Sequence, residues 1–113
     1  MTSSEQLQLV ALLQNTPWVE VAWLYGSRAT NTHSDASDFD VAVALRHDLL
    51  ASASEVDNPL DDLQYKLRIE LQLPISLVDI NRVPVPLAQN IVAQGKTLLC
   101  TSDLRLRMEE QRI

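Results

Sequence analysis

The chain has 113 residues, 46% of them hydrophobic, so it can bury a core but has little room for a second one; we expect a single domain at 1–113. A formal net charge of −6 argues against duplex DNA or RNA as the main target. We expect neither a signal peptide nor a membrane span, because the N-terminus lacks a basic region and the apolar runs are short. A single cysteine excludes an intramolecular disulfide and favours the cytoplasm.

Hydrophobic periodicity and turn residues predict alternating helices and strands. In chain order we expect a helix at 4–15, strands at 19–25 and 38–45, a helix from Pro59 that Pro74 stops, a strand at 75–80, a helix at 86–94, a strand at 96–100 and a helix at 102–112. The strand at 19–25 is apolar on both faces, which is typical of a central strand covered by helices. This order predicts an α/β or α+β sandwich, with helices packed on a small mixed sheet of three to four strands.

Apolar residues at helical spacing indicate which side of each helix faces the core. The expected core positions are Leu7, Val10 and Ala11 in the first helix, Leu60, Leu63, Leu67 and Leu71 in the second, and Leu87 and Ile91 in the third. We expect Trp18 and Trp23 in or near the core, and Cys100 as a small buried thiol. The last helix is most simply a solvated one, although its apolar residues also allow a surface that faces a partner.

The segment LYGSRATNTHSDASDFDVAV, residues 24–43, carries the most chemical information. A strand runs into Gly26 and Ser27; glycine allows a sharp turn and close approach of a ligand, and serine offers a hydroxyl and a backbone N–H to phosphate oxygens. A helix beginning there would also favour an anion. Arg28 could add a charge-assisted contact, but its side chain could equally point away.

Asp38 and Asp40 open the next predicted strand. Because they are two residues apart, their side chains share a face, with Cα atoms roughly 7 Å apart. Two such carboxylates repel each other by on the order of 3 kcal/mol at about 5 Å and an effective dielectric constant near 20, and a divalent cation relieves the repulsion. Oxygen ligands with open positions suit Mg²⁺, which also binds substrate phosphates. Since neighbouring strands lie about 4.8 Å apart, the pair and the Gly-Ser turn are expected to face one pocket.

Either feature alone has an ordinary explanation, a turn for Gly-Ser and a solvated strand edge for Asp-x-Asp, but their combination is far rarer. The pattern G-S-x10-D-x-D, met in full by Gly26-Ser27, residues 28–37 and Asp38-Phe39-Asp40, resembles the signature of the minimal nucleotidyltransferases of the DNA polymerase β-like superfamily. The segment LVDINRVPVPLAQNIVAQGKTLLCTSDLRLRMEEQ is similar to the second half of the MntA-type antitoxins, the partners of HEPN-domain toxins in type VII toxin–antitoxin modules.

The resemblance implies a nucleotidyltransferase fold, Mg²⁺ and ATP, and transfer of AMP to a tyrosine near the RNase site of a HEPN toxin. It also implies a third carboxylate on the strand after the long helix, where related chains read V-D-L-V-D-L and this one reads I-S-L-V-D-I. Asp79 matches the second acid of that pattern, whereas Ser76 replaces the first. Residues three apart on a regular strand face opposite sides, so only a bulge or the strand end would aim Asp79 at the metal. A second departure is Thr30-Asn31, where relatives often have Arg-Gly.

Three functions remain open at this point. The first is an antitoxin that adenylylates a HEPN toxin, with Asp38, Asp40 and Asp79 as catalytic residues, and Gly26, Ser27 and Arg28 holding the nucleotide. The second is an antitoxin that neutralises its toxin by binding alone, favoured by the doubtful third carboxylate. The third is a nucleotidyltransferase for a small molecule, which usually needs a second domain to hold the acceptor.

Overall fold

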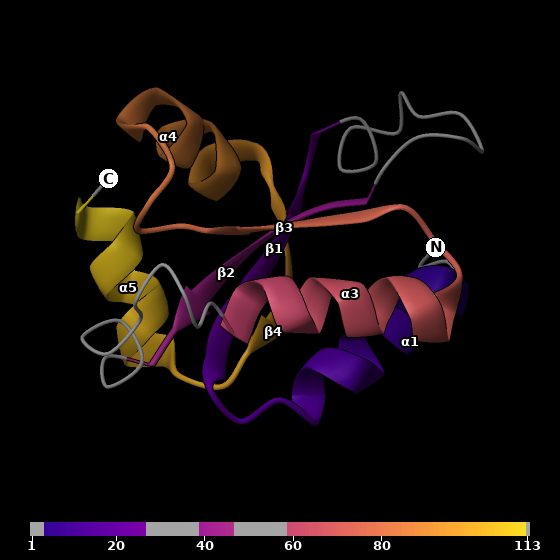
Figure 1. Cartoon of the computed structure of the whole chain (residues 1–113). Coiled ribbons are helices and arrows are strands. Elements are labelled where there is room, and N and C mark those ends of the chain that lie inside the picture. Colours follow the sequence, from indigo (N-terminus) through magenta and orange to yellow (C-terminus); the bar gives the residue numbers. More distant parts are fainter. Residues whose placement is uncertain (1–3, 27–38, 47–58, 113) are drawn as a thin grey trace.

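The structure is a computed structural model, and it describes residues 4–26, 39–46 and 59–112 (Figure 1). The elements in chain order are α1 (Ser4–Gln14), β1 (Val19–Tyr25), β2 (Phe39–Leu45), α3 (Pro59–Leu71), β3 (Ile75–Asp79), α4 (Val85–Gln94), β4 (Lys96–Cys100) and α5 (Asp103–Arg112). The predicted order of helices and strands is confirmed, with bounds close to those expected. In the described part of the chain no helix is long and apolar enough to cross a membrane.

The strands form one four-stranded mixed sheet in the order β3-β2-β1-β4. The central strand β1 is antiparallel to both β2 and β4, while β2 is parallel to β3. A chain that enters β1 from α1 and returns directly through β2 therefore brings the end of β1 beside the beginning of β2. The predicted α/β class and the central place of β1 are both confirmed.

Helices cover both faces of the sheet, and each face has its own apolar core (Figure 1). On the first face, buried residues of α1 and α3 pack against alternate residues of the strands, among them Leu24, Val41 and Leu77. On the second face, Ala88 and Ile91 of α4 pack against Trp23 and Ala42, and Leu106 of α5 joins them. The expected stripes of α3 and α4 are confirmed, as are the core or near-core positions of the two tryptophans.

The exposed edge of β3 is held by α3. The Leu77 N–H donates to Gln64 Oε1 at 2.8 Å, and Arg68 Nε donates to the Ile75 carbonyl at 2.7 Å. These two side chains satisfy backbone groups that β3, as an edge strand, has no neighbouring strand to pair with. They also fix the position of β3 relative to β2, which matters for the site.

Two predictions about burial are wrong. The core face of α1 is formed by Leu9 and Leu13, whereas Leu7 is exposed, because the helix is apolar around most of its circumference and packing against the sheet, not periodicity, selects the face. Cys100 is also exposed rather than buried, because it ends the edge strand β4, where its thiol donates to Asp103 at 3.5 Å.

The last helix, α5, buries two of its charged residues, Arg105 and Glu109, and exposes two of its large apolar residues, Leu104 and Met108. Ser102 caps it, accepting from the Arg105 N–H at 3.2 Å. Arg105 is only 2% exposed; its guanidinium donates to Glu109 at 2.8 Å and to the Leu45 carbonyl, and lies 3.8 Å from Glu20. One buried arginine therefore joins α5 to the ends of β1 and β2.

Candidate active site

The site begins with a row of three residues that cross the sheet at one end. Tyr25, the last residue of β1, pairs with Asp40 of β2, and Asp40 pairs with Ser76 of β3. Residues directly paired across strands place their side chains on the same face of a sheet. That face is the one covered by α4 and α5, because Ala42 and Val78, two residues further along their strands, pack in its core.

Gly26 lies against the carboxylate of Asp40. Its φ of +74° is in the left-handed region that favours glycine, and a Cβ at this position would lie 2.7 Å from Asp40 Oδ2. No ordinary contact is that short, so the Asp40 carboxylate occupies the space that any side chain at residue 26 would need. The expectation that the glycine turn and the acidic strand meet is thus met for Gly26 and Asp40.

Tyr25, the residue before Gly26, gives Asp40 a polar but neutral neighbour on the β1 side. Burial, and then the charge of the Asp40 carboxylate, raise the pKa of the Tyr25 phenol above its ordinary value of 10.0. The phenol therefore remains protonated at neutral pH and adds no negative charge next to Asp40.

The other residues of the predicted nucleotide and metal site lie outside the described residues: Ser27, Arg28 and Asp38, together with Thr30 and Asn31. Their roles stay predictions.

The structure does not bring Asp79 to this site. Asp79 pairs with Val43, three residues further along β2 than Asp40, which is about 10 Å and on the opposite face. The residue is only 6% exposed, and its carboxylate accepts from the Asn81 N–H at 2.9 Å and lies 3.7 Å from Arg82. Through these contacts Asp79 stabilises the turn between β3 and α4. A catalytic role for it remains a prediction that this placement does not support.

The donors present fit a hard divalent cation. The space in front of Asp40 is bounded by glycine backbone and by the hydroxyl-bearing residues Tyr25 and Ser76, an all-oxygen set of the kind that Mg²⁺ prefers. The described residues contain no group of three or more His, Cys, Asp or Glu that could hold a metal by itself. A cation here would therefore need Asp38 and ligands from its substrate in addition to Asp40.

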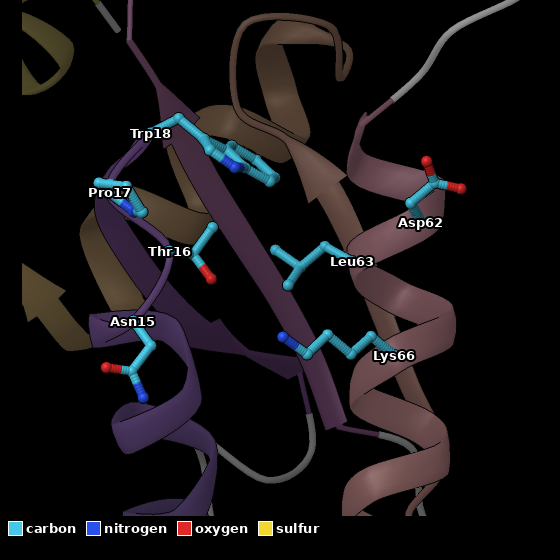
Figure 2. A pocket seen from close by; sticks show the side chains of 7 residues that line it. All are labelled: Asn15, Thr16, Pro17, Trp18, Asp62, Leu63 and Lys66. Atoms are coloured by element: carbon cyan, nitrogen blue, oxygen red, sulfur yellow. The ribbon is translucent and has the colours of Figure 1, made fainter.

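A cavity among the described residues lies elsewhere. It has a volume of about 360 Å³ and lies between the turn from α1 to β1 and the first half of α3, lined by residues that include Thr16, Trp18 and Lys66 (Figure 2). Trp18 precedes β1, whereas Gly26 follows it, so the cavity and Asp40 are at opposite ends of the strand. The cavity is therefore separate from the candidate active site.

Replacing Gly26 tests the contact with Asp40 directly. We expect Gly26→Ala to lower the free energy of unfolding by about 1–2 kcal/mol, because alanine resists a positive φ. It should also lower the affinity for a Mn²⁺–nucleotide complex at least about tenfold, because the new methyl displaces the Asp40 carboxylate. Urea unfolding and calorimetric titration measure the two effects. Asn90→Ala, on the exposed side of α4, is the control; equal behaviour of both variants would contradict the placement.

The sequence assigned no role to Tyr25, and it marked Ser76 only as the residue that replaces the first acid of the related pattern. The signal that identifies them is strand register, which aligns them with Asp40, and register depends on how the whole sheet assembles.

Comparison with known proteins identifies the family of the chain. The family described as Polymerase beta, Nucleotidyltransferase matches residues 7–104. The protein adenylyltransferase MntA of Shewanella oneidensis is 31% identical over 100 residues, which are 87% of this chain and 67% of that protein. A chain of a toxin–antitoxin structure with AMP-PNP has a TM-score of 0.76 at 24% identity, covering 95% of this chain and 82% of that one.

A second solved structure contains tri-AMPylated Shewanella oneidensis HEPN toxin in complex with MNT antitoxin. It has a TM-score of 0.69 at 22% identity and covers 96% of this chain and 79% of that one. The resemblance seen in the sequence is confirmed: the chain belongs to the polymerase β nucleotidyltransferase family.

Proposed function

We propose that this chain is an antitoxin that silences a HEPN-family RNase toxin by Mg²⁺-dependent transfer of AMP from ATP to a tyrosine of the toxin. The observation that carries the proposal is the close approach of Gly26 to the Asp40 carboxylate, which sets a tight backbone turn beside the acid proposed to bind Mg²⁺. The relatedness to a protein adenylyltransferase supports the choice of AMP and of a protein acceptor. The cytoplasmic location belongs to the same proposal.

In the proposed reaction the toxin's tyrosine oxygen forms a bond to the α-phosphorus of ATP. The bond between the α-phosphorus and the bridging oxygen breaks, pyrophosphate leaves, and the phenolic proton passes to solvent. Asp38 and Asp40 would hold Mg²⁺, which would neutralise triphosphate charge and align the reacting groups. Ser27 and the Gly26 backbone hold the phosphates, with Arg28 as an additional positive charge.

A binding-only antitoxin is the second candidate. It is favoured by the absence, among the described residues, of another carboxylate on the face and at the sheet end where Asp40 lies. In that case the chain would cover the toxin without modifying it, and suppression of the RNase would need neither ATP nor metal.

Intact mass spectrometry of the toxin separates the two candidates. The cognate HEPN protein is incubated with this chain, ATP and Mg²⁺, and parallel samples contain EDTA or lack ATP. We expect whole AMP units on the toxin in the complete sample alone, located by peptide mapping to a tyrosine. An unmodified toxin whose RNase activity is nevertheless suppressed equally in all three samples would establish binding alone.

A further inference from the structure

The neighbour of Asp40 on the β3 side is a serine. The parallel register pairs Asp40 with Ser76, so their side chains share the face covered by α4 and α5. Ser76 is half-buried on the edge strand, at the same end of the sheet as Gly26. The Gln64 and Arg68 contacts described above hold the backbone on both sides of Ser76, so its alignment with Asp40 is fixed.

The rest of β3 offers no other polar side chain to this face. Because side chains alternate along the strand, the next residue on the same face is Val78, which packs in the apolar core. Asp79 points to the other face, where its carboxylate contacts the Asn81 N–H and Arg82. On the opposite side of Asp40 lies the neutral Tyr25 phenol. The described neighbours of Asp40 across the sheet are therefore both uncharged hydroxyl groups.

We propose that Ser76 is a positioning residue of the metal site and that, because it is neutral, it limits the negative charge of that site to its two aspartates. A hydroxyl at a directly paired position lies beside the neighbouring carboxylate, close enough for a water bound to a cation there to bridge the two. It can orient Asp40 without adding a third negative charge to the two of Asp38 and Asp40. The inference rests on the proposed function for those two ligands.

The charge has a measurable consequence. With a neutral residue at 76, the chain supplies two negative charges, and a divalent cation gains most of its remaining ligands from the nucleotide's phosphates. The cation should therefore bind weakly alone and well as its nucleotide complex. A carboxylate at 76 would raise the affinity for the free ion, because a third negative charge attracts a divalent cation more strongly at short range.

Binding of Mn²⁺ to the purified chain, measured by electron paramagnetic resonance with and without AMP-PNP and without any toxin, tests the proposal. We expect Ser76→Ala to weaken binding of the Mn²⁺–nucleotide complex about three- to tenfold, the effect of losing one hydrogen bond, and Ser76→Thr to retain it. Ser76→Asp should tighten binding of free Mn²⁺ at least about tenfold. Thr97→Ala, on the exposed edge strand β4, is the matched control.

The outcomes are distinct from those that test AMP transfer. Wild-type Mn²⁺ binding in both Ser76→Ala and Ser76→Asp, with melting temperatures that show both are folded, would overturn the role of Ser76 even if the toxin is modified. The expected pattern of Mn²⁺ affinities, combined with a toxin that gains no AMP, would retain Ser76 and reject the transferase.

Discussion

Asp40→Asn should lower the rate of AMP transfer by about a hundred- to a thousandfold, the range found when one preorganised electrostatic group is removed from an active site. Asparagine keeps the shape of the side chain, so the space beside Gly26 remains filled and the fold should not change. It removes the charge that draws a divalent cation to the end of β2. Single-turnover rates from the intact mass of the toxin measure the loss.

The matched control is Asp61→Asn. Asp61 is an exposed carboxylate in the first turn of α3, on the other side of the sheet from Asp40. We expect it to change net charge by the same amount and the transfer rate by less than about twofold. A rate in Asp40→Asn that matched this control, with melting temperatures alike, would remove Asp40 from the mechanism.

Arg105→Ala should lower the free energy of unfolding by about 3–5 kcal/mol, because it removes one partner of a buried ion pair. Glu109, the other partner, is 3% exposed and would lose the guanidinium beside its carboxylate. Arg105 also supplies the link from α5 to the Leu45 carbonyl and Glu20. A loss of this size is a large part of the stability of a small domain.

A double substitution separates charge from packing. In Arg105→Met/Glu109→Leu both charges give way to apolar side chains of similar volume, and most of the lost stability should return, since replacing a whole buried pair is often neutral. Urea unfolding of wild type, single and double variants at one pH provides the comparison. If Arg105→Ala lowered the free energy of unfolding by less than about 1 kcal/mol, the contacts of the buried Arg105 would not be what holds α5 to the sheet.

The order and type of the elements could be predicted because local patterns determine them. Pro17 and Pro74 separate the elements beside them, and the leucines of α3 repeat at helical spacing. The face of α1 could not be predicted, because Leu7, Leu9 and Leu13 are equally apolar and only the sheet selects among them. The burial of charged residues in α5 could not be predicted either. In the sequence Arg105 and Glu109 look like solvated charges, and only the structure shows that they are buried and hydrogen-bonded to each other.

The chemistry of the site divides in the same way. The spacing of Gly26, Ser27, Asp38 and Asp40 is a property of the sequence and could be recognised there. The approach of Gly26 to Asp40 follows because β1 and β2 are consecutive and antiparallel. The positions of Ser76 and Asp79 depend on the register of a parallel pair whose strands are separated by a helix, and no local pattern encodes it.

The central claim is that a divalent cation and a nucleotide bind together at the end of β2, beside Gly26. The most direct test is a crystal structure of this chain with Mg²⁺ and AMP-PNP. We expect the ion to be bound by the Asp38 and Asp40 carboxylates and by phosphate oxygens, with the phosphates over the Gly26-Ser27 backbone. Nucleotide seated instead in the cavity beside Trp18, or an ion that leaves the Asp40 carboxylate without a contact, would contradict the claim.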